Sequence, residues 1–252
     1  MKTESSLRLP FFNLPVLICF ALFWTLAICA YASTITVTTT NDSGPGSLRQ
    51  ALVDANDGDT ITFAVTRTIG LTSGELAIDK NVTITGPGPD RLAVSGSFST
   101  FRVFHVMPGR TVNIEGLTVT FGFAQFDVGG GILNDHAILA LTNCSVATNG
   151  AFYGGGGIYN DGGKGSATLT IIDSSVTGNG AGGSSPADGG GIYNNGAAIL
   201  TIINSTISGN SAVGEFELSG GGGGIAGGGT IINSTIAGNH AALEGGGIDG
   251  GA

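Results

Sequence analysis

The sequence predicts an all-β protein built as a parallel β-helix, a solenoid in which each coil of the chain stacks on the one before. Three observations carry this prediction: a heptapeptide repeated about every 30 residues, glycine runs that close on isoleucine, and short strands rich in β-branched residues. Helical repeats are excluded because glycine, a poor helix former, supplies 46 of the 252 residues.

The heptapeptide sets the period of the stack. Its four copies start 30, 31 and 29 residues apart and occupy residues 143–149, 173–179, 204–210 and 233–239. Each copy ends on asparagine, and asparagine recurring at one site is typical of an amide ladder in stacked strands. We expect these asparagines to form one column, at a turn where asparagine tolerates left-handed backbone geometry. They are Asn149, Asn179, Asn210 and Asn239.

Glycine runs that end on isoleucine alternate with the heptapeptides. They close at Ile132, Ile158, Ile192, Ile225 and Ile248. Glycine suits tight turns and places where backbones approach closely. The distances between these isoleucines vary, so we expect loops of variable length, notably 180–188 and 213–224, to project from a regular core.

Short apolar stretches supply the predicted strands, for example residues 169–171, 200–202 and 230–232. A single coil cannot bury its own apolar face. Stacking at the ordinary strand spacing of about 4.8 Å buries a continuous column of Val, Ile and Leu.

Together these signatures resemble the right-handed parallel β-helix proteins of the pectate-lyase-like superfamily. The resemblance covers residues 35–252 and is greatest to bacterial secreted and surface proteins that include polymorphic outer-membrane repeat proteins. Residues 46–56 and 59–63 are similar to the N-terminal module of such proteins, with Gly46 in place of its usual cysteine. The resemblance implies a right-handed coil.

Three segments are predicted along the chain. Residues 1–32 indicate an export signal, with a basic start, an apolar run and a small-x-small cleavage site; an uncleaved membrane anchor is the alternative. Residues 33–63 are expected to form a strand and a helix that cap the solenoid. Residues 64–252 contain the repeats and stop one signature into a new coil, so we expect a longer native chain.

The cap is expected to cover the open end of the column. Ser47 opens the predicted helix as a capping box with Gln50, and residues 56–58 end it. One face of this helix is apolar, formed by Leu48, Ala51, Leu52 and Ala55.

Charge and cysteine content narrow the class of protein. Of nine basic and eighteen acidic residues, the export segment holds Lys2, Arg8 and Glu4, which leaves seven and seventeen. So acidic a surface does not bind nucleic acid. Cys144 is the one cysteine left after cleavage, so no internal disulfide is expected; it occupies a slot held by serine in other coils and is interpreted as a small buried residue.

Few residues are candidates for chemistry. Asp135 and Asp161 occupy equivalent positions in successive coils, with Asn195 next. Two carboxylates one rung apart would bind Ca²⁺ or keep one carboxyl protonated, whereas the interpretation we favour is two solvated turn residues. Tyr159 and Tyr193 share a rung, as a structural stack or a sugar platform.

The remaining candidates are weaker. The three histidines, His105, His136 and His240, are far apart in sequence and not in equivalent positions, which disfavours a histidine metal site. Beyond Arg110 only Lys164 is available as a base, in a loop expected to be exposed. We therefore predict no catalytic, metal or cofactor-binding residue.

The expected function is that of a secreted or cell-surface protein, extracellular or on a bacterial outer membrane, that is not an enzyme and serves as an adhesin-like or structural display scaffold. Its expected partner is a host or cell-surface glycan or protein, with membrane contact only through the signal segment or a missing C-terminal anchor. The alternative is a polysaccharide-binding protein, or a lyase or hydrolase, because the superfamily it resembles contains such enzymes.

Overall fold

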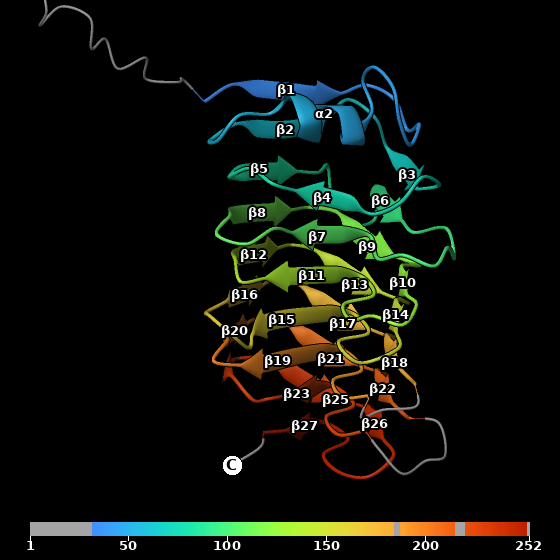
Figure 1. Cartoon of the computed structure of the whole chain (residues 1–252), viewed down its shortest axis with the longest axis vertical. Helices are drawn as coiled ribbons and strands as arrows, with labels where there is room; N and C mark the ends of the chain where they lie inside the picture. Colours follow the sequence, from blue (N-terminus) through green and yellow to red (C-terminus); the bar gives the residue numbers. More distant parts are fainter. Residues whose placement is uncertain (1–31, 184–186, 215–219, 251–252) are drawn as a thin grey trace, which may run out of the picture. The chain divides into compact units, whose positions relative to one another are not determined.

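The computed structural model describes residues 32–183, 187–214 and 220–250, which form a parallel β-solenoid of about seven coils (Figure 1). The predicted all-β solenoid with a short N-terminal helix is confirmed. The export segment up to residue 31 and parts of the two predicted loops lie outside the described residues. Residues from Ala32 onward belong to one compact unit, so the predicted cap and the coils fold together.

Four parallel sheets, here named A to D, are stacked along this unit. Sheet A contains β1 (Thr34–Val37), β2 (Thr60–Phe63), β5 (Val82–Thr85), β8 (Thr111–Glu115), β12 (Ile138–Thr142), β16 (Thr168–Ile172), β20 (Ile199–Ile203) and β24 (Thr230–Ile232). Sheet B contains β3 (Arg67–Gly70), β6 (Leu92–Ser95), β9 (Thr118–Thr120), β13 (Ser145–Ala147), β17 (Ser175–Thr177), β21 (Thr206–Ser208) and β25 (Thr235–Ala237).

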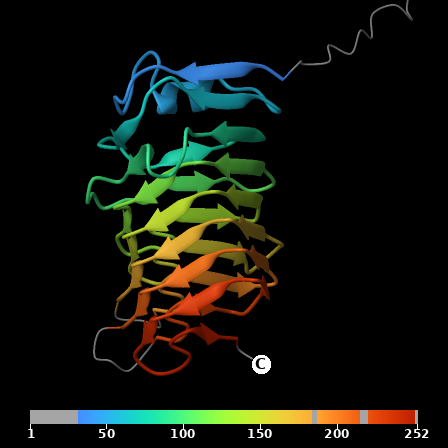
Figure 2. The ribbon, with the colours of Figure 1, turned by 180° about the vertical axis from the view of Figure 1, so that it is seen from behind.

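The other two sheets complete each coil. Sheet C contains β4 (Leu76–Ile78), β7 (Phe104–Val106), β11 (Ile132–Asp135), β15 (Ile158–Gly162), β19 (Ile192–Gly196), β23 (Ile225–Ala226) and β27 (Ile248–Asp249). Sheet D begins later and contains β10 (Phe123–Ala124), β14 (Gly150–Ala151), β18 (Gly180–Ala181), β22 (Ser211–Ala212) and β26 (His240–Ala241). A coil therefore runs from sheet A through B and D to C, and Figure 2 shows the successive rungs one above another.

The core is built from columns of identical or similar side chains. In sheet A, Leu139, Leu169 and Leu200 are paired in register and buried. Equivalent columns of isoleucine and valine line sheets B and C, since alternate residues of each short strand point inward. The predicted strands at 169–171, 200–202 and 230–232 are confirmed, and so is the shared register of the heptapeptides.

The four closing asparagines form the predicted ladder. In each of its three links, one Nδ2 donates to the Oδ1 of the next asparagine at 2.9 to 3.0 Å, and that oxygen also accepts the main-chain N–H at 3.0 Å. The predicted left-handed geometry at these asparagines is wrong. Left-handed backbone is found instead at the residue before a ladder asparagine, such as Gly178 with φ +62°. It is also found at the first residue of the heptapeptide, such as Asn204 with φ +50°. The side-chain amides of the ladder asparagines instead bond to one another from coil to coil.

Replacing Asn179 by alanine is expected to lower the free energy of unfolding by about 3 kcal/mol, because Asn149 loses the acceptor for two buried donors. The amide of Asn179 is 1% exposed and also donates to the carbonyl of Val146. Urea unfolding measures the change. The control is Thr177→Ala, since Ala147 occupies that place in the adjacent coil, and it should shift stability by less than about 0.5 kcal/mol. Equal midpoints for the two variants would contradict the ladder's importance.

The glycine runs lie where backbone meets backbone, as predicted. A Cβ added at Gly130, Gly156 or Gly190 would lie 1.9, 2.2 or 2.3 Å from the carbonyl oxygen of a residue in sheet D. The loop predicted at 180–188 begins instead with strand β18, because Gly180 and Ala181 pair with β14 and β22.

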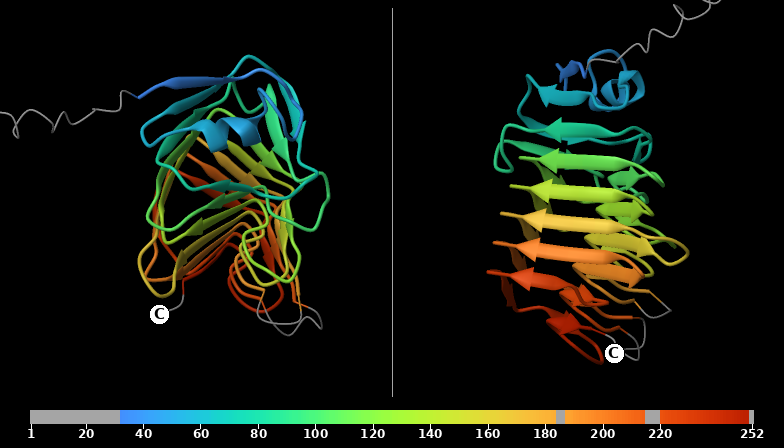
Figure 3. Two further views of the ribbon diagram at one scale, coloured as in Figure 1. Left: turned by 45° about the horizontal axis from the view of Figure 1, so that its top comes forward. Right: turned by 90° about the vertical axis from the view of Figure 1, so that its left-hand side faces the viewer.

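Helix α2 (Leu48–Asp54) lies across the N-terminal end of the column (Figure 3, left). All four predicted apolar residues, Leu48, Ala51, Leu52 and Ala55, are buried. The capping box is only half formed. The Ser47 hydroxyl accepts from the N–H of Gln50 at 3.1 Å, but the Gln50 side chain donates to Asp54 at 2.8 Å because the Ser47 N–H already donates to Gly44.

Candidate functional site

The predicted alignment of Asp135, Asp161 and Asn195 is confirmed by the register of β11, β15 and β19. Asp161 Oδ1 accepts from the N–H of Gly163 at 2.9 Å and from the Asn195 amide at 3.1 Å. Asp135 makes no such turn contact. Both of its oxygens face imidazoles, so the interpretation of the two aspartates as solvated turn residues is incomplete.

Two histidines meet at Asp135. His136 Nδ1 lies 2.5 Å from Asp135 Oδ1, and His105 Nε2 lies 3.4 Å from Asp135 Oδ2. His105 and His136 are not in equivalent positions, as expected, because His105 pairs with Leu133 in the register of β7 and β11. They nevertheless contact the same carboxylate from adjacent coils. His240 differs: it lies in β26 of sheet D.

Glu75 extends this group toward the N-terminal end. Its Oε1 lies 3.1 Å from His105 Nδ1, and its other oxygen lies 2.7 Å from Arg102 Nε. Arg102 also pairs with Asp127 and donates to the carbonyl of Val128 at 2.9 Å. We name Glu75, His105, Asp135, His136 and Asp161 the His–carboxylate cluster. Its sequence signal was present, since Glu75, His105 and Asp135 are each 30 residues apart.

Electrostatics follow from these contacts. Hydrogen bonding to Glu75 raises the pKa of His105 against the opposing effect of burial, and the same contact lowers the pKa of Glu75. Hydrogen bonding to Asp135 raises the pKa of His136. The His136 Nε2 atom is shielded from solvent and has no hydrogen-bond partner among the described residues. The cluster thus concentrates negative charge around two imidazoles.

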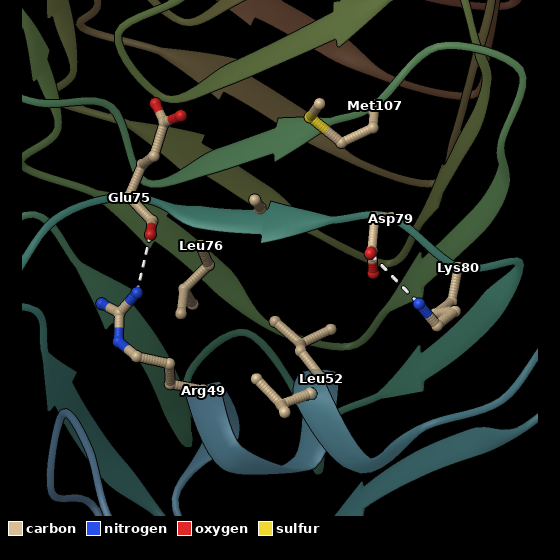
Figure 4. A pocket seen from close by; sticks show the side chains of 9 residues that line it. Arg49, Leu52, Glu75, Leu76, Asp79, Lys80 and Met107 are labelled. Carbon is tan, nitrogen blue, oxygen red and sulfur yellow. Dashed lines mark hydrogen bonds and ion pairs between the residues drawn. The ribbon is translucent and has the colours of Figure 1, made fainter.

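A groove of about 530 Å³ lies between α2 and β4, beside this cluster (Figure 4). Leu52, Leu76 and Met107 are among the residues that line it, and the Lys80–Asp79 ion pair at 3.1 Å lies at its other end. Arg49 donates to the main-chain oxygen of Glu75 at 2.7 Å, and the Glu75 carboxylate points away from the helix. The groove is therefore mainly apolar, with the cluster's carboxylate directed out of it.

The structure places the other predicted candidates away from the His–carboxylate cluster or on its own rungs, as follows. Burial raises the pKa of the Cys144 thiol to about 11, and Cys144 heads a ladder in which each main-chain N–H donates to the next serine hydroxyl, as from Cys144 to Ser174 at 2.9 Å. Tyr159 and Tyr193 stack edge to face with ring centroids 5.1 Å apart. Lys164 is exposed in the turn after β15, as expected.

Sequence reasoning missed a second surface feature, a set of aromatic side chains at the turns between sheets B and C. Phe98 and Phe121 stack with centroids 4.2 Å apart, and Phe152 contacts both Phe126 and Tyr153 at 5.0 and 5.1 Å. We name this set the aromatic corner. Its members are Phe98, Phe121, Phe123, Phe126, Phe152 and Tyr153.

The protein is therefore a parallel β-solenoid that carries a His–carboxylate cluster on sheet C and an aromatic corner. Within the described ranges, no helix is long and apolar enough to cross a membrane.

Comparisons with known proteins do not assign the chain to a family. No family model matches the sequence, and no curated protein matches it. A solved structure to which the chain is similar is ORF18 of Geobacillus virus E2, with 11% sequence identity and a TM-score of 0.41. The match covers 86% of this chain and 59% of that protein.

Proposed function

We propose that this protein is a secreted or surface β-solenoid of the pectate-lyase-like type that binds an uncharged glycan and does not cleave it. This binding would serve adhesion, or the display of a binding surface on a stiff column. The repetition between coils supports a scaffold, since the ladders and core columns continue unbroken past both sites.

The observation that carries this proposal is the backbone of the aromatic corner. Phe98, Phe121 and Phe126 have φ of 58°, 52° and 58°, a region that bulky residues rarely adopt. The equivalent of Phe121 is Thr148 with φ +58° in the next coil and glycine in later coils, at Gly178 and Gly209, so the left-handed turn recurs along the stack. Strain of this kind is found mainly where surrounding structure and function require the side chain.

The exposure of the rings supports a role in binding. Phe98 is 78% and Phe126 is 63% exposed, although phenylalanine gains most from burial. Phe98 follows β6, Phe121 and Phe126 follow β9 and β10, and Phe152 follows β14, so the rings come from three successive coils. Two groups of stacked aromatic rings suit a polymer of repeated sugar rings, whose apolar C–H faces pack against aromatic rings.

The net charge of the chain favours one kind of glycan over another. The chain carries a formal net charge of −9, so an acidic polysaccharide would be repelled. This argues for an uncharged glycan and against the acidic substrates of the lyases that the sequence resembles.

Affinity electrophoresis in gels that contain neutral polysaccharides, with a glycan array to choose them, tests this proposal. Phe98→Ala and Phe126→Ala are each expected to weaken binding about tenfold, since a stacked ring contributes on the order of 1 kcal/mol or more. The matched control is Ile199→Thr, because Ile199 is 59% exposed and pairs with Thr168. Binding that is equal in all variants would contradict the assignment.

Product analysis on the bound polysaccharide separates display from catalysis. We expect no change in chain length of the glycan after prolonged incubation. Turnover would replace the display proposal by the lyase or hydrolase alternative. Capture of a protein ligand with no glycan bound would contradict the glycan assignment.

A further inference from the structure

The His–carboxylate cluster has the donor set of a metal site. Asp135, His136 and Asp161 each offer one ligand atom, and these atoms lie within 4.8 Å of one another. A metal ion at about 2.1 Å from each ligand would draw such atoms to roughly 3.4 Å, a change that side-chain rotation supplies. His105 Nε2, 3.4 Å from Asp135 Oδ2, adds a second imidazole.

The two ring nitrogens of His105 each face a carboxylate oxygen, Nδ1 that of Glu75 and Nε2 that of Asp135. A neutral imidazole carries one N–H, so when Glu75 accepts from Nδ1 the lone pair of Nε2 faces Asp135. Either a second proton or a bound cation at Nε2 relieves this repulsion, and a metal ion would take the place of that proton. A carboxylate on the far side of a histidine is the arrangement that orients metal-bound imidazoles in proteins.

The other two groups are also available to an ion. Asp161 uses only Oδ1 in its hydrogen bonds to Gly163 and Asn195 within the described residues, so Oδ2 is open to an ion. His136 is held only through Nδ1, because its Nε2 has no partner in the described part of the chain. Because Nε2 is shielded from solvent, His136 would bind the ion through Nδ1, the atom that lies 2.5 Å from Asp135 Oδ1.

We propose that Asp135, His136 and Asp161, with His105 as a fourth donor, bind one divalent transition-metal ion such as Zn²⁺ at the outer face of sheet C. Imidazole nitrogens favour Zn²⁺ and related ions, whereas Ca²⁺ takes oxygen ligands almost entirely. Glu75 positions His105, and Arg102 holds Glu75 at 2.7 Å. The site joins β7, β11 and β15, so a bound ion would clamp three successive coils.

Isothermal titration calorimetry with ZnCl₂ on the purified full chain, free of any histidine tag, tests the site. We expect one ion per chain, with affinity lowered at least tenfold in Asp135→Asn and in Asp161→Asn. Asp161→Asn is compatible with the fold, since Asn195 occupies the equivalent place in the next coil. CaCl₂ is expected to bind more weakly than ZnCl₂.

The matched control is Asp173→Asn. Asp173 is an exposed carboxylate in the same repeats, and asparagine stands at its equivalents, Asn143 and Asn204, with the same left-handed backbone. This variant should bind Zn²⁺ as the original chain does. The proposal fails if the original chain binds no Zn²⁺, if both cluster variants retain full affinity, or if Ca²⁺ binds as tightly as Zn²⁺. Circular dichroism of each variant confirms that any loss reflects the ligand and not the fold.

Discussion

Replacing Gly156 by alanine is expected to destabilise the solenoid by at least about 4 kcal/mol, a change large enough to unfold a marginally stable chain. The added Cβ would lie 2.2 Å from the carbonyl oxygen of Gly180 and 2.6 Å from that of Gly190. Both atoms belong to backbone that is hydrogen-bonded in the stack, so relief requires coils to separate. A thermal melt and a urea titration followed by circular dichroism measure the loss.

Gly180→Ser is the matched control for this change. The Cβ at Gly180 meets nothing closer than 4.0 Å, and Ser211 occupies the same place in the next coil. The expected shift is within about 0.5 kcal/mol. If Gly156→Ala melted together with Gly180→Ser, close backbone contact would not be the reason for the glycine runs.

The double substitution Leu48→Asp with Leu52→Asp is expected to uncover the N-terminal end of the column and produce soluble aggregates. Both leucines are buried against the first coils, and an unpaired carboxylate placed there would expel α2 to reach water. The exposed rung would then pair with other chains, as unprotected strand edges do. Size-exclusion chromatography with light scattering measures the outcome.

Val53→Asp tests whether the effect belongs to the buried face. Val53 lies on the same helix but is 70% exposed, so its aspartate variant should elute as the unmodified chain does. A double variant that also elutes unchanged, with the same melting temperature, would show that α2 is not needed as a cap.

The repeat made the fold predictable because each coil must bury its apolar side chains against the same side chains of the next coil. Register errors would move Leu169 or Ile171 out of the core, and only one alignment superimposes both the heptapeptides and the isoleucines that end the glycine runs. The turn geometry was harder to predict. Asn179 was placed in left-handed backbone by propensity, whereas its amide is committed to the ladder and Gly178 takes that geometry.

The His–carboxylate cluster was only partly predictable. Asp135 and Asp161 followed from the repeat, but His105 lies in β7, a coil without the heptapeptide, and its contact with Asp135 depends on how that coil joins the stack. The aromatic corner was missed because phenylalanines in apolar surroundings are expected to be buried. Phe98 and Phe126 lie in two different turns, where both have left-handed backbone and exposed rings.

Sequence alone determined the architecture of this protein: a stack of coils, its period, its ladder of asparagines and a helix at its N-terminal end. These features repeat or are local, so nearest-neighbour physics specifies them. Tertiary structure alone decided which unique side chains meet, since Glu75, His105 and Asp135 become neighbours only when coils 30 residues apart are placed one rung apart.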